Sequence, residues 1–316
     1  MYEIEYLNKK GDYLIKVNKG KNILLQNDRQ ILLYEIKEKS KYKLLDKIES
    51  EIGIIDLTML SNEMIITSGR KTIIVYKKIE NSTYRIHQKI FNHDWAEIYR
   101  IKELENKNLA VCGWIGFIIF EMKENNQYEI ILKNTGNEND NFYRIYDFME
   151  IKGKVNNYIL LSDNHALIIK GNDIIKIIDL EDNNHKYFFS KGFMCQLNNA
   201  LFVLSGVQYI TLFNANTNQI KKSDFLKEND YDIRRKKITN SCPNLFKFNT
   251  NSIILFTYEG IFIINIIQEE KIQVQLRISL NLYYSSNHYF NQEENSIYFS
   301  EKNFWKKLKF KNKYFN

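Results

Sequence analysis

Three stretches of the sequence share one pattern that decides the fold: residues 54–76, IIDLTMLSNEMIITSGRKTIIVY, residues 98–120, IYRIKELENKNLAVCGWIGFIIF, and residues 194–213, MCQLNNALFVLSGVQYITLF. Each begins with an apolar segment that ends in Leu and is followed by a turn containing Asn. A second apolar segment then closes on a small residue plus Gly, and a third ends in an aromatic residue. Such β-branched and aromatic runs, bounded by turn residues, are typical of strands buried on both faces.

The turn residues support strands joined by hairpins. An Asn side chain can bond the nearby backbone, and Asn tolerates left-handed dihedrals, which suits the first turn of each copy. A Gly after the second strand supplies the positive φ that a tight hairpin needs. The turn residues in question are Asn62, Asn106 and Asn198 for the first role, and Gly69, Gly113 and Gly206 for the second.

Weaker copies of the pattern occupy the rest of the chain. The last apolar residue of each third strand serves as a marker, at Tyr34, Tyr76, Phe120, Ile178, Phe213, Ile264 and Leu308. These markers recur about every 46 residues, close to the roughly 40–45 of a four-stranded repeat unit. The copy that ends at Ile178 is predicted to carry an insertion around residues 164–171. Fourth strands are expected after the markers, for example at residues 42–48, 84–90, 128–132 and 272–278.

The two ends of the chain complete the pattern. The seventh copy lacks an outer strand after Leu308, and a surplus strand at residues 2–7 precedes the first copy. If the N-terminal strand supplies the missing one, the last sheet hides the edge that it would otherwise expose. The sequence therefore predicts an all-β, seven-bladed β-propeller of four-stranded antiparallel blades, with residues 1–316 as a single domain.

This arrangement resembles the WD-repeat family over essentially the whole chain. The strand rhythm, the Gly turn and the aromatic strand ending match the family. Its Gly-His and Trp-Asp dipeptides are missing, and the Trp-Asp positions hold pairs such as Tyr34-Glu35 and Tyr76-Lys77. The resemblance implies a platform for binding other proteins, usually without catalysis, although a propeller fold does not by itself define a function.

Composition indicates a soluble intracellular protein. The 316 residues carry a net charge of +7, and Lys supplies the excess as expected from A+T-rich codons. The three cysteines, Cys112, Cys195 and Cys242, show no paired spacing, which is typical of a reducing compartment such as the cytoplasm. We find neither a signal peptide nor a membrane span in the pattern, and expect no secretion or membrane insertion.

No motif in the sequence indicates catalysis. The five histidines lack metal-ligand spacing, and there is no nucleophile elbow or Gly-rich phosphate loop. We therefore expect no enzyme, no cofactor and no metal. An alternative remains in which side chains of the first strands meet in a central channel and bind a small anionic ligand or act on it.

Three charged residues stand at equivalent positions of successive first strands. Arg100 and Arg144 each lie four residues before a strand-end marker, and Asp56 has the same offset in the preceding copy. First strands line the channel of a propeller, so we expect a polar cluster there. Arg captures carboxylates or phosphates with two parallel hydrogen bonds. The alternative is an internal Asp–Arg pair that satisfies the channel wall.

Two connections are predicted to reach the face where WD-repeat proteins bind. His93, Asp94 and Trp95 lie in the connection into the third copy, and Trp114 lies beside Gly113 in the next turn. Tryptophan at a polar loop is a frequent interface anchor. The alternative for both tryptophans is burial between neighbouring blades.

The longest loop, near residues 221–239, carries the basic run Arg234, Arg235, Lys236 and Lys237. Loops of this length are usually functional. The run is a candidate for an acidic protein or for RNA phosphate, whose binding would weaken steeply with salt. The sequence thus favours a protein-binding scaffold within a multi-subunit assembly, with an RNA-associated propeller as the alternative.

Overall fold

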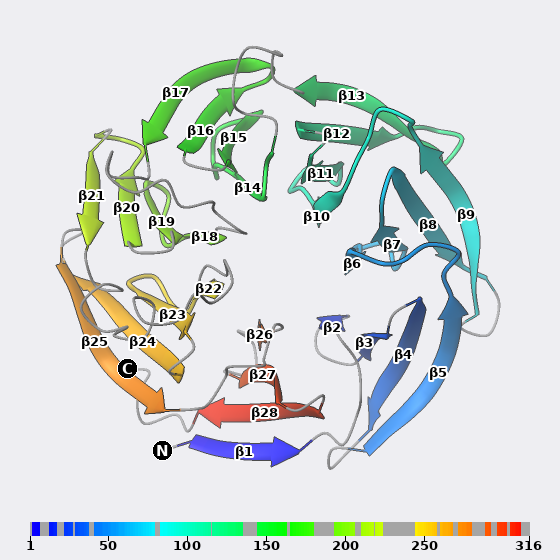
Figure 1. Ribbon diagram of the computed structural model, residues 1–316, viewed down its shortest axis with the longest axis horizontal. Coiled ribbons are helices and arrows are strands. Elements are labelled where there is room, and N and C mark those ends of the chain that lie inside the picture. Colours follow the sequence, from blue (N-terminus) through cyan, green and yellow to red (C-terminus); the bar gives the residue numbers. More distant parts are fainter. Residues whose placement is uncertain are drawn as a thin grey trace. The chain divides into compact units, whose positions relative to one another are not determined.

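The computed structural model describes the strands of the chain and many of the turns that join them (Figure 1). The described residues are 2–6, 13–17, 22–27, 29–37, 41–79, 83–114, 116–134, 144–162, 165–179, 193–205, 210–217, 219–223, 244–257, 260–267, 271–279, 288–291, 296–301 and 304–310. Within these ranges every regular element is a β-strand.

The described strands form seven four-stranded sheets, each a run of consecutive strands except the last. The first three are β2–β3–β4–β5 (Tyr13–Val17, Asn22–Asn27, Gln30–Lys37, Lys41–Glu49), β6–β7–β8–β9 (Asp56–Met59, Ile65–Ser68, Thr72–Lys78, Tyr84–Phe91) and β10–β11–β12–β13 (Ile98–Glu103, Leu109–Gly113, Gly116–Met122, Tyr128–Asn134). The next three are β14–β15–β16–β17 (Asp147–Glu150, Asn157–Leu161, His165–Lys170, Asp173–Asp179), β18–β19–β20–β21 (Phe193–Gln196, Leu201–Ser205, Ile210–Asn214, Ile220–Ser223) and β22–β23–β24–β25 (Asn244–Lys247, Ser252–Thr257, Gly260–Ile267, Lys271–Ser279). The seventh has the order β1–β28–β27–β26 (Tyr2–Tyr6, Phe304–Phe310, Ser296–Glu301, His288–Asn291).

By their contacts the residues group into two compact units. Unit 1 comprises residues 1–111, 120–129 and 284–316, and unit 2 comprises residues 112–119 and 130–283. In unit 1, one core lies between the sheets β2–β5 and β6–β9 and includes Leu33 and Ile74. In unit 2, one core joins the sheets β14–β17 and β18–β21, and another joins β18–β21 and β22–β25. The expectation of a single domain stays a prediction.

The second and third strands of the sheets are buried on both faces, as the apolar runs predicted. All four residues of β7 and all five of β11 are buried, and β8 and β12 are buried over most of their length. Because side chains alternate between the two faces of a strand, burial of consecutive residues means that both faces of these strands are shielded from water. The all-β fold of four-stranded sheets that the repeat predicted is confirmed.

The Asn turns are confirmed, but the side-chain hydrogen bond and the left-handed dihedral belong to two different residues. The side chains of Asn62, Asn106 and Asn198 each accept a hydrogen bond from the backbone N–H two residues later, at 3.1, 3.1 and 2.9 Å. The left-handed dihedral falls instead on the residue after the Asn, as at Glu63 (φ 65°) and Lys107 (φ 69°).

The predicted positive φ is wrong for Gly69 and Gly113, and Gly206 lies outside the described residues. In the hairpins β7–β8 and β11–β12 the positive φ occurs at Lys71 (φ 60°) and Gly116 (φ 78°), which follow Gly69 and Gly113 in the chain. Gly69 is required by a close approach of two backbones, since a Cβ atom there would lie 2.7 Å from the carbonyl oxygen of Gly53. Glycine is therefore needed at residue 69 because the segment that leads into β6 passes close to it, and not because the turn requires a positive φ.

The predicted insertion at residues 164–171 is also wrong. His165–Lys170 is the third strand of its sheet, β16, and the residues 174–178 assigned to the third strand belong to the fourth, β17. The tight turn between them has Gly171 at φ 59°. Both strands are runs of branched apolar residues, so periodicity alone does not separate an inner strand from an outer one.

The N-terminal strand completes the last sheet, as predicted. β1 pairs antiparallel with β28, with Ile4 opposite Leu308 and Glu3 opposite Lys309 (Figure 1). Leu308 is fully buried. The two ends of the chain are thus joined by a backbone ladder within unit 1.

Hydrogen bonds tie the sheet β2–β5 to the sheet β6–β9, and the sheet β6–β9 to β10 of the following sheet. In unit 1, the Gln26 side chain donates to the carbonyl of Ile54 at 2.9 Å, and the Ser68 hydroxyl donates to the carbonyl of Ile98 at 3.1 Å. Asp56 on β6 accepts a hydrogen bond from the backbone N–H of Ile101 on β10 at 2.7 Å. Asp56 is buried, and this loss of solvent raises its pKa above the ordinary 3.8 despite the opposing attraction of Arg100.

We expect two neighbouring prolines in β1 to differ in effect. Adjacent residues of an antiparallel strand alternate between bonding their partner strand and facing away from it. One of Glu3→Pro and Ile4→Pro therefore removes a ladder hydrogen bond, and should lower the free energy of unfolding by roughly 1–3 kcal/mol more than the other. Urea denaturation measures both variants. Equal stability of both variants and the unchanged protein would show that β1 does not take part in the cooperative fold.

Asp56→Asn should change the pH dependence of stability. Because the folded state raises the pKa of Asp56, it holds this proton more tightly than the unfolded chain does. The contribution of Asp56 to stability therefore grows as pH falls from 7 toward 3.8 and is lost as pH rises through the folded-state pKa. Relative to the unchanged protein, the Asn variant should gain most at pH 7 and least near pH 4. If the Asn variant instead gained more stability at pH 4 than at pH 7, the attraction of Arg100 would outweigh the effect of burial on the pKa of Asp56.

Candidate functional site

The most exposed predicted anchor is Trp114, in the turn between β11 and β12. It exposes 42% of its surface, and the guanidinium carbon of Arg144 lies 3.6 Å from the centroid of its ring. Arg144 precedes β14, and the N–H of Ile145 donates to the carbonyl of Gly113 at 3.0 Å. This backbone bond holds the start of one sheet against the turn of the preceding one, which places the arginine over the indole.

The Trp114–Arg144 pair combines an apolar plane with a fixed cation. Stacking uses the face of the guanidinium, whereas its N–H groups donate in the plane of the group. A partner that covers the indole and presents a carboxylate at the edge of the guanidinium would engage both residues. An exposed stack of this kind is worth about 0.5–1 kcal/mol to the free protein, so its main effect is to orient the arginine.

Trp95 does not form an exposed anchor. It is 3% exposed and packs edge-to-face on Phe120, with ring centroids 6.1 Å apart. The predicted role of Trp95 as a surface anchor is therefore replaced by the alternative of burial. The physical reason is the large apolar area of the indole, which is removed from water here, and the backbone N–H of Trp95 closes the local turn by donating to the carbonyl of Asn92 at 3.2 Å.

The neighbours of Trp95 remain at the surface. His93 and Asp94 are exposed, and the His93 ring meets the exposed Phe91 ring edge-on at 4.7 Å. The Lys71 ammonium donates to the carbonyl of His93 at 2.8 Å. The loop therefore presents an aromatic pair, of which the sequence analysis selected only the histidine.

The residues of the expected polar cluster lie in separate units. In unit 1, Arg100 is the cation that acts most strongly on the carboxylate of Asp56. Asp56 itself is held by the backbone of Ile101, which fits the alternative of an internal pair. Arg144 belongs to unit 2, where it stacks on Trp114. It lies before β14, whereas Arg100 lies within β10, so the prediction that the two arginines stand at equivalent positions of first strands is wrong. A cluster of all three stays a prediction.

The basic run Arg234, Arg235, Lys236 and Lys237 lies outside the described residues. Among those that are described, no group of three or more His, Cys, Asp or Glu residues is placed to hold a metal ion. Cys112 and Cys195 are buried free thiols, and burial raises the pKa of Cys195. The described part of the chain contains no helix with the length and apolarity to cross a membrane.

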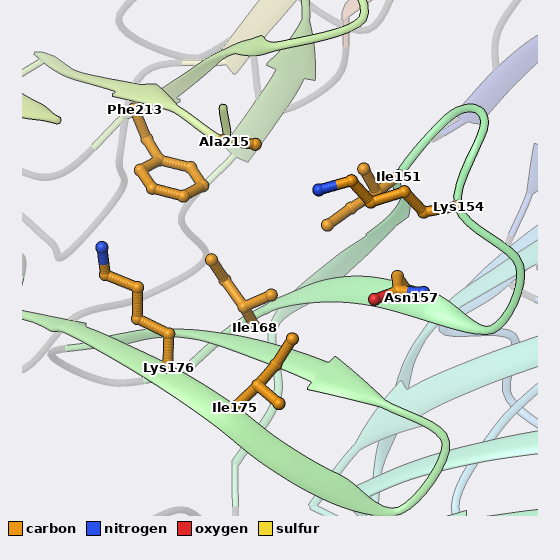
Figure 2. Close-up of a pocket in the computed structure, with 8 residues that line it drawn as sticks. All are labelled: Ile151, Lys154, Asn157, Ile168, Ile175, Lys176, Phe213 and Ala215. Carbon is orange, nitrogen blue, oxygen red and sulfur yellow. The ribbon is translucent and has the colours of Figure 1, made fainter. Parts of the chain in front are cut away.

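One pocket was missed by the sequence analysis. It lies in unit 2 against β17, and its lining residues are Ile151, Lys154, Asn157, Ile168, Ile175, Lys176, Phe213 and Ala215 (Figure 2). The signal that could have found it is the lysine within the apolar run of residues 173–179, DIIKIID, because a strand buried on both faces would not carry a charge at its centre.

Sequence comparison identifies no relatives. No family model matches the chain, and no curated protein matches it. The structure, in contrast, is similar to several solved structures over nearly its whole length. A chain in the crystal structure of the mitotic checkpoint complex aligns with a TM-score of 0.70 at 10% sequence identity, covering 97% of this chain and 92% of that chain.

Two lyases are also similar over nearly the whole chain. A streptogramin B lyase aligns with a TM-score of 0.65 at 14% identity, covering 97% of both chains. The virginiamycin B lyase from Staphylococcus aureus aligns with a TM-score of 0.66 at 12% identity, covering 98% of this chain and all 100% of the enzyme. Identities this low carry the fold and nothing of the activity. The chain therefore has a β-propeller fold, in which each four-stranded sheet is one blade.

Proposed function

We propose that the chain is a non-catalytic β-propeller of the WD-repeat type, which binds partner proteins within a larger assembly. The Trp114–Arg144 stack is the observation that carries this proposal. Tryptophan and arginine are the residue types that most often dominate the binding energy of protein interfaces. Here they are held in contact at the surface before any partner arrives, which lowers the entropy lost on binding.

The position of the pair supports the same function. Trp114 lies in the turn between the second and third strands of its blade, and Arg144 lies at the entry to the next blade. In unit 1, the equivalent places hold Arg70 and Glu97, which form an ion pair at 3.2 Å. The repeat thus brings side chains from two successive blades together at this edge. In unit 2 this pair is an aromatic ring and a cation, whereas in unit 1 it is an anion and a cation.

The comparisons are compatible with this proposal without deciding it. One similar chain comes from a multi-protein complex, and the other similar proteins are lyases. The proposal favours binding because it rests on an exposed aromatic–cation pair rather than on a set of acid and base groups. We also propose a reducing intracellular location, which the buried free thiols of Cys112 and Cys195 favour.

Trp114→Ala should abolish binding of the partners. We expect affinity capture from the native cell, with mass spectrometry at two salt concentrations, to recover a defined set of proteins with the unchanged chain. Loss of a central aromatic anchor costs about 2 kcal/mol or more, which is about a 30-fold loss of affinity. Arg144→Lys keeps the charge but not the planar stack, and should weaken capture less than Arg144→Ala.

Two further variants control this experiment. Ile86 is an exposed apolar residue on β9 in unit 1, and Ile86→Ala should leave the captured set unchanged. Trp95→Ala should lower the free energy of unfolding by roughly 3–5 kcal/mol, whereas Trp114→Ala should cost about 1 kcal/mol or less. If all folded variants recover the same proteins as the unchanged chain, the Trp114–Arg144 pair is not the binding site.

A further inference from the structure

The pocket in unit 2 has an apolar floor with a cation on either side (Figure 2). Ile151, Ile168 and Phe213 form buried parts of its wall. The ammonium groups of Lys154 and Lys176 border it from opposite sides, and no Asp or Glu is among the lining residues (Figure 2). The Lys176 ammonium lies 5.4 Å from the centroid of the Phe213 ring. The pocket is thus apolar within and positive at its margin.

A β-bulge in β17 creates one wall of this pocket. Ile169 pairs with Ile174 and Ile168 pairs with Lys176, so Ile175 is an extra residue in the ladder. A bulge sets two residues opposite one and re-aims their side chains. Ile175 and Lys176 therefore stand together opposite Ile168, and all three line the pocket.

The same bulge recurs in the outer strands β5 and β9, where it positions a side chain that binds the next blade. In β5 and β9 the residues after the extra one are Asp46 and Gln88. Asp46 accepts a hydrogen bond from the N–H of Tyr84 at 2.8 Å, and Gln88 accepts one from the N–H of Tyr128 at 2.8 Å. Each bulge in unit 1 thus anchors the tyrosine that begins the outer strand of the next blade.

Lys176 holds the corresponding place in β17, and the outer strand of the next blade begins with a different residue type. Tyr84 and Tyr128 are buried, whereas β21 of the next blade begins at the half-exposed Ile220. The residues before Ile220 are Asn214 to Gln219, NANTNQ, and Ala215 is the one that lines the pocket. Ala215 contributes only a methyl group to the wall of the pocket, whereas a buried tyrosine begins the corresponding strand of the blades in unit 1.

The surface around the pocket is apolar as well. Ile174, Ile175 and Ile177 of β17 expose 39, 58 and 47% of their surfaces. These three isoleucines lie within four consecutive positions of one outer strand. Contiguous exposed apolar surface of this kind often marks a site where a partner binds. A covering partner would remove this surface from water at about 25 cal/mol per Å².

We propose that this pocket binds an acidic segment of a partner protein, with one large apolar side chain of the segment in the pocket and flanking carboxylates on Lys154 and Lys176. The volume of the pocket is about 210 Å³. That is less than the roughly 300–1,000 Å³ of sites for drug-sized ligands. It exceeds the roughly 150 Å³ that accommodate a benzene ring, so a phenylalanine or leucine side chain fits. The site is separate from the Trp114–Arg144 pair and does not depend on it.

The test uses a fluorescein-labelled peptide of sequence Gly-Glu-Asp-Phe-Asp-Glu-Gly and fluorescence anisotropy. Two control peptides replace either the central Phe with Ala or the four acids with their amides. We expect the unchanged full-length chain to bind the first peptide at least about tenfold more tightly than either control, because each control removes one half of the recognition.

Matched protein variants separate the pocket from the overall charge. The double variant Lys154→Glu with Lys176→Glu should bind about tenfold more weakly. The control pair Lys43→Glu with Lys133→Glu, at exposed positions of other outer strands, lowers the net charge by the same four, from +7 to +3, and should bind as the unchanged protein does. Ala215→Phe should block the pocket with its own ring, whereas Ala215→Gly should leave it open.

Each outcome decides the proposal. Equal weakening by the two charge pairs, or binding that survives both the pocket lysine changes and Ala215→Phe, overturns it. Displacement of the peptide by 4-methylbenzoate at the same concentration as by unlabelled peptide would also overturn it, since a small acid would then suffice. If Ala215→Phe does not fold, the lysine pair decides alone. Trp114→Ala should bind the peptide normally, so a failure of the proposed function and a failure of this inference give different results.

Discussion

Each blade depends on the burial of its two inner strands on both faces. Strands such as β7 and β11 are mostly apolar and are buried along their whole length, so a four-stranded sheet leaves both of its faces unfavourable in water until another sheet covers each of them. The cores observed within each unit are accordingly shared by successive sheets rather than enclosed by one. A blade of this kind is therefore not expected to fold alone. Its outer strand and its turns are more exposed than its inner strands, so they are less constrained by packing.

Short polar devices determine how successive blades meet. Asn side chains close the first turn of the blades β6–β9, β10–β13 and β18–β21. Gly69 allows the close approach of the Gly53 backbone, and Ser68 and Asp56 bond the blade that follows. The buried carboxylate of Asp56 is the most costly of these devices, because burial opposes its charge. Its hydrogen bond to Ile101 and the nearby Arg100 offset part of that cost. Such contacts explain why polar residues recur in the repeat without implying catalysis.

The two proposed binding surfaces arise where the repeat departs from its own pattern. Trp114 and Arg144 stack at a junction whose counterpart in unit 1 is the ion pair of Arg70 and Glu97. Lys176 stands at a bulge whose counterparts in unit 1 anchor a tyrosine, and Ala215 of the next blade lines the pocket beside it. In both places the backbone follows the repeat while the side chains do not. These differences from the repeat, at exposed or half-buried side chains, are the observations on which the two proposed binding surfaces rest.

The sequence alone determined the strand count of most blades, the Asn turns and the pairing of the N-terminal strand with the last sheet. These features depend on local periodicity and on the need to cover edges, both of which can be followed along the chain. It also selected Trp114 and Arg144, although as separate candidates. Only the tertiary structure decided that they stack, that Trp95 is buried, that β16 is an inner strand and that a bulge opens a pocket beside β17. These outcomes depend on which residues of different blades come together, and a pattern of apolar residues does not specify that.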